Sequence, residues 1–160
     1  NVAGKRGTAM HNYLEYMVAG KNLLDLTEEG VEAQRMAEVV RDKGFTDLEE
    51  IWGSEVVISY PGLYAGQTDL CGIYQGRESI IDFKQSNKPK KEEWIEDYYY
   101  QMVAYAMAHD AVHGTQIEQG VILMCTPDLF FQKFVLNGAR FRQYKWKWLW
   151  RLSEYYRKKM

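Results

Sequence analysis

The sequence has few cysteines and no long apolar stretch. Its only cysteines, Cys71 and Cys125, form no paired metal-binding motif and are too few to ligate an iron–sulfur cluster. No apolar run approaches the ~20 residues of a membrane-spanning helix, and no signal-peptide pattern is visible. We therefore expect a reducing compartment of cytoplasmic type, no contact with a membrane and no iron–sulfur cofactor.

The chain also lacks internal repeats and low-complexity linkers, which favours a single domain over residues 1–160. That length is sufficient to bury a sizeable core. The composition, 46% hydrophobic and 26% charged, is typical of a globular protein. The first residue is Asn1 rather than methionine, which leaves open that preceding residues are missing.

The formal net charge of −2 conceals an uneven distribution. The segment from Ala139 to Met160 carries eight Lys or Arg and one acidic residue, whereas the rest of the chain carries 12 basic and 21 acidic residues. A near-neutral total therefore does not argue against nucleic acid as a partner, because the positive charge is concentrated in one segment.

Hydrophobic periodicity predicts an alternation of helices and strands. Helices are expected at residues 8–20, 28–43, 92–113 and from 139 onward, and strands at 54–61, 63–74, 79–85, 121–125 and 130–136. The second helix has Thr27 as its expected N-cap and ends at Gly44. The strand–helix–strand unit that ends at 121–125 implies a parallel pair with a right-handed crossover. The predicted fold class is α/β, a sandwich with a mixed central sheet.

The most informative segment is the hairpin that contains Asp69, Asp82 and Lys84. Strand side chains alternate, so Asp82 and Lys84 point to the same face. A two-residue turn at Gly76-Arg77 would place Asp69 opposite Lys84 and diagonal to Asp82. Two ionised carboxylates about 5 Å apart repel by roughly 3 kcal/mol at an effective dielectric near 20, and a divalent cation removes this penalty. Oxygen ligands favour magnesium or manganese, whereas the alternative is a solvated face on which Lys84 pairs with Asp69.

His11 lies at the edge of the apolar stripe of the first expected helix, where it is either a boundary residue of the core or a ligand. Gly7 and Thr8 just ahead could cap this helix, and free N–H groups at such a terminus can hold a phosphate. Lys5 and Arg6 would then face solvent beside it, although a basic N-terminal turn also occurs without any function.

The helix expected at 92–113 has one face formed by Trp94, Tyr98, Gln101, Tyr105 and Val112. Burial of an amide in such a stripe requires partners, so Gln101 either bonds a neighbouring backbone group or serves a site, with Tyr105 one turn later. Glu55 begins another strand, where it either faces the same groove as Asp69 or lies in solvent.

The final helix has two aromatic faces. One is expected to join the core and consists of Phe141, Tyr144, Trp148, Leu152 and Tyr155. Trp146 and Trp150 are out of phase with it, on the opposite face near Arg142 and Arg157. Exposed tryptophans among arginines suit stacking on single-stranded bases, worth about 1–3 kcal/mol per base. A contact with another chain or with a missing segment is the equal alternative.

Four segments resemble the RecB-like nuclease family of the PD-(D/E)xK superfamily in order and spacing. They are Gly7-Thr8-Ala9-Met10-His11, Gly66-Gln67-Thr68-Asp69, Ile81-Asp82-Phe83-Lys84 and Gln101-Met102-Val103-Ala104-Tyr105. The run from Asp82 to Lys90 is most similar to the subgroup of mitochondrial genome maintenance exonucleases and small phage exonucleases. Thr68 stands where the superfamily name has proline, which is usual among RecB-like members, and the missing cysteines exclude the iron–sulfur branch.

The resemblance implies a core of restriction-endonuclease type and a metal-dependent DNA exonuclease that hydrolyses phosphodiester bonds of single strands or DNA ends by metal-activated water. The implied ligands of magnesium or manganese are His11, Asp69, Asp82 and the Phe83 carbonyl, with Glu55 as an outer or second-metal ligand. Lys84 would position or help deprotonate the water. Gln101 and Tyr105 would orient the site and the DNA.

The expected DNA contacts are Lys5, Arg6, Thr8, Ser86, Lys88, Lys90, Lys91, Trp146 and Trp150. Two other functions are compatible with the pattern: a structure-dependent endonuclease of the same superfamily, and a catalytically dead module that binds DNA. The final helix could also mediate self-association. The implied compartment is the cytoplasm of a bacterial or phage-infected cell, with the mitochondrial matrix as the alternative.

Overall fold

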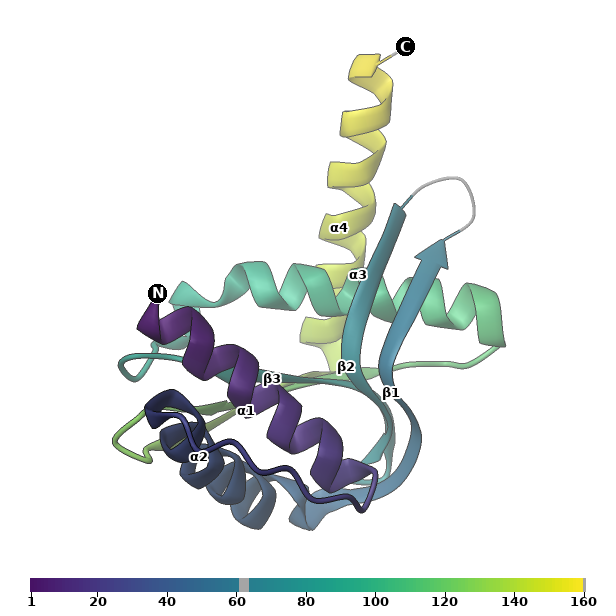
Figure 1. The fold of residues 1–160 in the computed structure, drawn as a ribbon. Coiled ribbons are helices and arrows are strands. Elements are labelled where there is room, and N and C mark those ends of the chain that lie inside the picture. The colour runs from purple at the N-terminus through teal and green to yellow at the C-terminus, as the bar shows by residue number, and fades with distance from the viewer. Residues whose placement is uncertain (61–63, 160) are drawn as a thin grey trace.

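A computed structural model describes residues 1–60 and 64–159, and the side chains of residues 55–65 are outside the description. The elements, in chain order, are α1 (Val2–Val18), α2 (Glu28–Gly44), η1 (Phe45–Asp47), β1 (Leu48–Tyr60), β2 (Tyr64–Tyr74), β3 (Arg77–Gln85), η2 (Glu92–Trp94), α3 (Glu96–His113), β4 (Gln119–Cys125), β5 (Phe131–Asn137) and α4 (Gly138–Lys159) (Figure 1). This is the predicted order, with β1 beginning at Leu48 rather than at residue 54. The predicted end of that strand at Pro61 lies outside the described residues.

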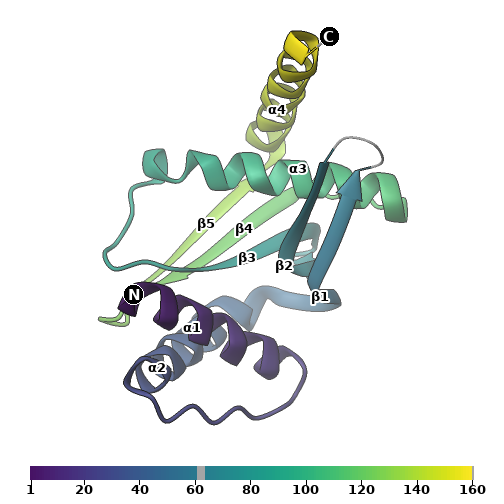
Figure 2. The same cartoon turned by 45° about the horizontal axis from the view of Figure 1, so that its top comes forward.

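The five strands form one sheet in the order β1-β2-β3-β4-β5. Strands β3 and β4 are parallel, and the other neighbours are antiparallel. Helix α3 connects the parallel pair, because parallel strands need a long crossover. Helices α1 and α2 cover one face of the sheet, α3 covers the other, and α4 packs on α3 (Figure 2). The predicted α/β fold with a mixed central sheet is confirmed.

Apolar side chains of the sheet alternate between two cores. Every residue of β4 is buried, with Val121 and Leu123 packed towards α1 and α2 and Ile122 and Met124 packed towards α3. The prediction of a strand buried on both faces is therefore confirmed. The same alternation in β3 directs Asp82 towards the α3 side of the sheet.

Helix α1 begins earlier than predicted. Its N-cap is Asn1, whose side chain accepts a hydrogen bond from the Gly4 N–H. Gly7 and Thr8 therefore lie inside the helix, and the predicted phosphate-holding terminus at these residues is wrong. No proline interrupts the preceding turn, so the helix can extend back to its cap. Helix α2, in contrast, begins after Thr27, which is its N-cap as predicted.

The apolar face predicted for α3 is wrong. Trp94 and Val112 of the predicted stripe are exposed, and Gln101 is exposed as well. The buried residues are instead distributed around the helix, at Tyr99, Tyr100, Met102, Val103, Ala104, Ala106, Ala108 and His109. The physical reason is that the sheet covers one side of α3 and α4 covers another, so no single stripe marks its buried surface.

The first turns of α4 pack on the body, and the rest of the helix projects from it (Figure 1, yellow). Phe141 is buried, Tyr144 and Trp148 are half-buried, and Tyr155 is exposed. The predicted apolar stripe is therefore right at the base of the helix and wrong at its end. Among the described helices, none is both long enough and apolar enough to cross a bilayer.

Candidate active site at a fork in the sheet

The turn between β2 and β3 sets the register of the acidic residues. Tyr74 pairs with Arg77, so the turn residues are Gln75 and Gly76, with φ of 51° and 74°. Two consecutive left-handed residues are typical of the hairpin turn whose twist matches that of the strands. The predicted turn at Gly76-Arg77 is therefore wrong by one residue.

This register brings Asp69 level with Asp82, not with Lys84 as predicted. The β2–β3 ladder ends at the pair Leu70–Ile81. Beyond it, β2 continues beside β1, and β3 continues beside β4. The two aspartates thus lie where the sheet divides, and we call this place, with Asp69, Asp82 and Lys84, the fork.

Two backbone N–H groups and the Thr68 hydroxyl contact the two carboxylates at the fork. Asp69 Oδ2 accepts a hydrogen bond from the Phe83 N–H at 2.8 Å. Asp82 Oδ1 has longer contacts, at 3.4 Å each, with the Asp69 N–H and the Thr68 hydroxyl. Asp82 is only 4% exposed, and this burial raises the pKa of Asp82 above its usual range, although the charge of Lys84 opposes the shift. A buried carboxylate with long hydrogen bonds favours a cation beside it.

The ammonium group of Lys84 lies 4.6 Å from the ring centroid of Tyr98 on α3. An aromatic face attracts such a cation through its quadrupole. Lys84 makes no ion pair with the part of the chain that the structure describes, and Asp69 pairs with His11 instead. The alternative of a Lys84–Asp69 pair is therefore wrong. The sequence interpretation missed Tyr98 as a site residue, although it lies one helical turn before Gln101.

His11 connects α1 to the fork. Its Nε2 lies 3.3 Å from Asp69 Oδ2, and its Nδ1 lies 2.9 Å from the Gly7 carbonyl oxygen. A carbonyl can only accept, so Nδ1 carries a proton and Nε2 is the atom presented to the carboxylate. Burial disfavours the charged imidazole, but the hydrogen bond and charge of Asp69 outweigh it and raise the pKa of His11 to about 9.

These residues have the donor types of a magnesium or manganese site, namely carboxylate oxygens, a backbone carbonyl and an imidazole. The bond from His11 Nδ1 to a backbone carbonyl is the contact that orients metal-binding histidines. Within residues 1–60 and 64–159, however, no group of three or more His, Cys, Asp or Glu side chains is arranged to hold an ion. Asp69 Oδ2 is directed at the Phe83 amide and at His11 instead. The donors fit a divalent cation in their chemistry, and metal binding stays a prediction.

Helix α3 forms a wall of the fork. Tyr105 packs so closely against β2 that a Cβ on Gly66 would lie 2.1 Å from Tyr105 Cε1. Gln101 lies between Tyr98 and Tyr105 on this helix face and is exposed, so its amide is accessible to a ligand. The side chain of Glu55 lies outside the described residues, and its role stays a prediction.

Comparison with known proteins agrees with the resemblance inferred from the four segments. The chain is 30% identical over 161 residues to mitochondrial genome maintenance exonuclease 1 of Homo sapiens, covering 96% of this chain and 46% of that protein. It is 32% identical over 117 residues to the same exonuclease of Mus musculus, covering 69% of this chain and 34% of that protein. The chain is related to these exonucleases. It spans less than half the length of the relatives it matches, and no protein-family model matches it.

A solved structure supports the fold assignment. The chain superposes with a TM-score of 0.63 on a protein described as a candidate exonuclease from Eubacterium rectale, over 95% of this chain and 64% of that one. The sequence identity is 14%, so this likeness concerns the fold. The mixed sheet flanked by helices is that of a PD-(D/E)xK-like core, as predicted.

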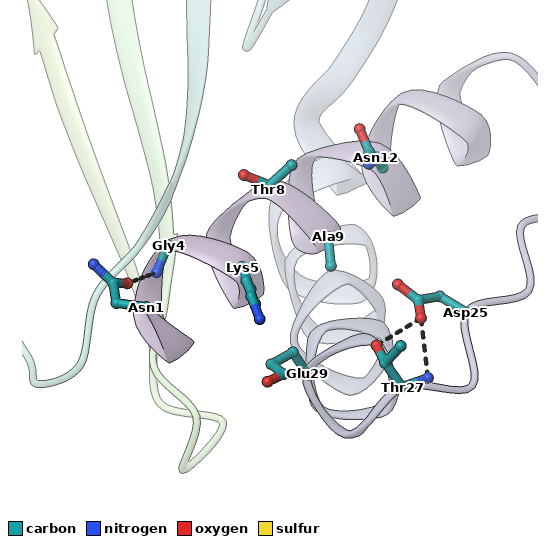
Figure 3. A pocket seen from close by; sticks show the side chains of 9 residues that line it. All are labelled: Asn1, Gly4, Lys5, Thr8, Ala9, Asn12, Asp25, Thr27 and Glu29. Carbon is teal, nitrogen blue, oxygen red and sulfur yellow. Dashed lines mark hydrogen bonds between the residues drawn. The ribbon is translucent and has the colours of Figure 1, made fainter.

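The predicted DNA contacts on α1 do not share one environment. Lys5 and Thr8 line a pocket of about 670 Å³ between α1 and the start of α2, which also contains Asp25 and Glu29 (Figure 3). Two carboxylates in this pocket disfavour a phosphate. Arg6 makes an ion pair with α2, and its side chain is 12% exposed, so the expectation that Arg6 faces solvent is wrong.

The loop after β3 borders a second pocket, of about 450 Å³, which Tyr98, Lys88 and Lys90 help to line. Ser86 is buried, and its hydroxyl donates to the Lys88 carbonyl, so this side chain shapes the loop. The backbone N–H and carbonyl of Lys90 both bond the Gln132 side chain, each at 2.8 Å. The loop therefore presents two ammonium groups beside the fork from an anchored backbone.

The two tryptophans predicted to stack on bases lie on α4. Trp146 is 73% exposed and Trp150 is 66% exposed, which confirms that they are out of phase with the core stripe. Trp146 lines a cleft with Met107, which lies about half a turn around α3 from Tyr98, the residue at Lys84, so the structure does not bring these tryptophans together with the fork.

Proposed function

We propose that this chain is a metal-dependent nuclease that hydrolyses phosphodiester bonds of DNA. One observation carries the proposal: a buried carboxylate, a second carboxylate and a lysine meet at the fork, with His11 beside them. The relationship to proteins named as exonucleases supports action at strand ends. Single-stranded DNA or frayed ends are the proposed substrates.

Asp69, Asp82, the Phe83 carbonyl and His11 Nε2 would hold magnesium or manganese. A bound divalent cation would lower the pKa of the attacking water and neutralise charge that develops on the phosphate. His11 would offer the cation the Nε2 that now faces Asp69, while its Nδ1–H stays on the Gly7 carbonyl oxygen.

Lys84 would act on the reacting phosphate itself. Its ammonium group shares a strand face with Asp82 and is held over Tyr98, so it can donate hydrogen bonds to a phosphate oxygen or orient the water that attacks phosphorus. The water oxygen forms the new bond to phosphorus and gives its proton to solvent, while the bond from phosphorus to the sugar oxygen breaks and that oxygen leaves as an alcohol after it takes a proton from solvent. The exposed Gln101 amide on the α3 wall would orient the strand.

The loop of Lys88 and Lys90 offers a path for the DNA backbone. Both ammonium groups are exposed beside the pocket that Tyr98 lines, and each phosphate contact releases counterions.

Cys71 and Cys125 are buried and free, which agrees with a reducing compartment, either the cytoplasm or a mitochondrial matrix.

The proposal is tested by Asp82→Asn, which removes the charge and preserves the shape. We expect the wild-type chain to release nucleotides from end-labelled single-stranded DNA with magnesium or manganese but not with EDTA, and we expect Asp82→Asn to lose this activity at least 100-fold. Asp128→Asn, at an exposed loop residue, is the matched control and should keep full activity. Digestion by Asp82→Asn at the wild-type rate would contradict the proposed site.

A covalently closed single-stranded circle distinguishes an exonuclease from an endonuclease. We expect the linear form of the same strand to be digested and the circle to persist. Cutting of the circle at the rate of the linear strand would replace the exonuclease proposal by an endonuclease.

A further inference from the structure

The α4 helix carries much of the positive charge of the chain away from the body. Residues Ala139 to Lys159 contain eight Lys or Arg and one acidic residue, Glu154, whereas the rest of the chain is acidic. The helix packs at its base and then projects into solvent (Figures 1 and 2). A basic helix on an acidic body is complementary in charge to a polyanion such as a DNA strand.

One face of α4 combines this charge with exposed indole rings. Arg142, Trp146 and Trp150 succeed one another at intervals of four residues, so they share one helix face. The tryptophans are 73% and 66% exposed, and Arg142 makes no ion pair with a described residue. Four residues correspond to about 6 Å along the axis, so the two indole rings belong to neighbouring turns of this face and both are accessible to bases.

A cleft lies next to this face, between α3 and α4. Its volume is about 570 Å³, and it is lined by Met107, Asp110, Ala111, Arg142, Lys145, Trp146 and Leu149. Its lining is largely apolar and includes two cations, Arg142 and Lys145. The carboxylate of Asp110 is already engaged, because it accepts hydrogen bonds from the Thr115 hydroxyl and the Ile117 N–H. An apolar slot beside cations suits a base with its phosphate.

This face is separate from the fork. On α3, Tyr98 is the residue whose ring lies against the Lys84 ammonium group at the fork, whereas Met107 lines the cleft beside α4. Nine residues separate them, which corresponds to about half a turn around the helix axis. The helix α3 therefore stands between the two places, and a strand at one does not occupy the other.

We propose that Trp146, Trp150 and Arg142, with the adjoining α3–α4 cleft, form a second binding site for single-stranded DNA, remote from the fork. The site would hold a strand by stacking on its bases and by contact with its phosphates, and it would do so without preference for sequence. This inference rests on the proposed function only in taking DNA as the polymer. It adds a surface that would bind part of a long DNA strand at a distance from the fork, where the strand is cleaved.

The test measures binding of the wild-type chain and its variants to a fluorescein-labelled oligothymidylate of about 20 nucleotides, in EDTA so that no cleavage occurs. We expect the double variant Trp146→Ala/Trp150→Ala to bind at least tenfold more weakly. Tyr155→Ala is the matched control, because this exposed aromatic residue lies about half a turn from Trp146, and it should bind like the wild type.

Salt dependence tests the role of Arg142. Arg142→Ala should reduce the slope of log K against log salt by about 0.7, the value for one phosphate contact on a single strand. Lys158→Ala, on another side of the helix, should leave the slope unchanged. The proposal would be overturned if the double tryptophan variant and Tyr155→Ala lost equal affinity for the oligothymidylate, or if the double variant bound it as tightly as the wild type.

Two further measurements distinguish failure of the second-site proposal from failure of the nuclease proposal. Cleavage of a trinucleotide, chosen to occupy the fork alone, should be unchanged in the double variant. Absence of cleavage by the wild type, with the binding difference intact, would refute the nuclease proposal alone. Gel filtration showing a wild-type dimer that Trp146→Ala dissociates, with oligonucleotide affinity unchanged, would assign this face to self-association and overturn the inference.

Discussion

The fork and α4 hold charge in opposite ways. At the fork, Asp82 is almost fully buried and its contacts are backbone and side-chain groups at fixed places. On α4, the basic side chains are largely exposed and lie over aromatic rings, as Lys147 does over Tyr144 and Lys159 over Tyr155. The fork thus has a few charged groups in fixed positions, whereas α4 has many charged groups along an exposed surface.

The difference matters for chemistry. Buried charges interact strongly with their neighbours and are costly when a partner is removed, so substitutions of the charged residues at the fork should have a large effect on the reaction. Exposed charges are screened and interchangeable, so losses on α4 should be graded and dependent on salt. The predictions below test this contrast, and they also separate the anchored base of α4 from its free end.

The largest effect is expected at the base of α4. Phe141 is the buried anchor of the helix, and Phe141→Ala should lower the free energy of unfolding by about 3–5 kcal/mol through lost burial and a cavity. Urea unfolding followed by circular dichroism measures it. Tyr155→Ala at the free end should change stability by less than about 0.5 kcal/mol. Equal losses in both variants would show that the whole helix is packed.

Lys84→Ala should reduce the rate of DNA cleavage by about 10²–10³-fold, because a donor to the reacting phosphate is lost. Single-turnover cleavage of a labelled strand measures this effect. Stability should change little, since Lys84 pairs with no described carboxylate. Lys21→Ala, an exposed lysine after α1, is the control and should cleave normally. If both variants cleave alike, Lys84 is not part of the reaction.

Tyr98 should matter through its ring and not through its hydroxyl. Tyr98→Leu removes the face over which Lys84 lies and should slow cleavage by about threefold to tenfold, whereas Tyr98→Phe should stay near the wild-type rate. The effect should appear in kcat with little change in KM. Equal rates for the Leu and Phe variants would mean that the ring does not position the lysine.

The smallest effect is expected from the exposed lysines. Lys88→Ala should raise KM for single-stranded DNA about twofold to fivefold at low salt, with the difference shrinking as salt is added. Lys5→Ala should have less effect, because Asp25 and Glu29 share its pocket. A larger loss for Lys5→Ala than for Lys88→Ala would reverse the path proposed for the strand.

Much of the fold and part of the site could be predicted from local pattern. The continuous apolar run of β4 indicated burial on both faces, and alternation placed Asp82 and Lys84 on one face. Helical phase separated Trp146 and Trp150 from the core stripe. Each of these features depends on a repeat of two residues or of 3.6, which the backbone imposes wherever the element forms.

Three features could not be predicted in this way, because the first depends on the type of a turn and the other two depend on what packs against a helix. The register that brings Asp69 level with Asp82 follows from the left-handed pair at Gln75 and Gly76. Gln101 is exposed because α3 is covered on two other sides. Arg6 is partly buried because α2 supplies an ion pair.

The sequence alone thus determined which residues have the chemistry of the fork and that Asp82 and Lys84 share one strand face, because these properties are local. Tertiary structure decided which of them meet. Contacts such as His11 with Asp69 and Lys84 with Tyr98 join elements distant in the chain, and their geometry depends on how the whole sheet and its helices pack.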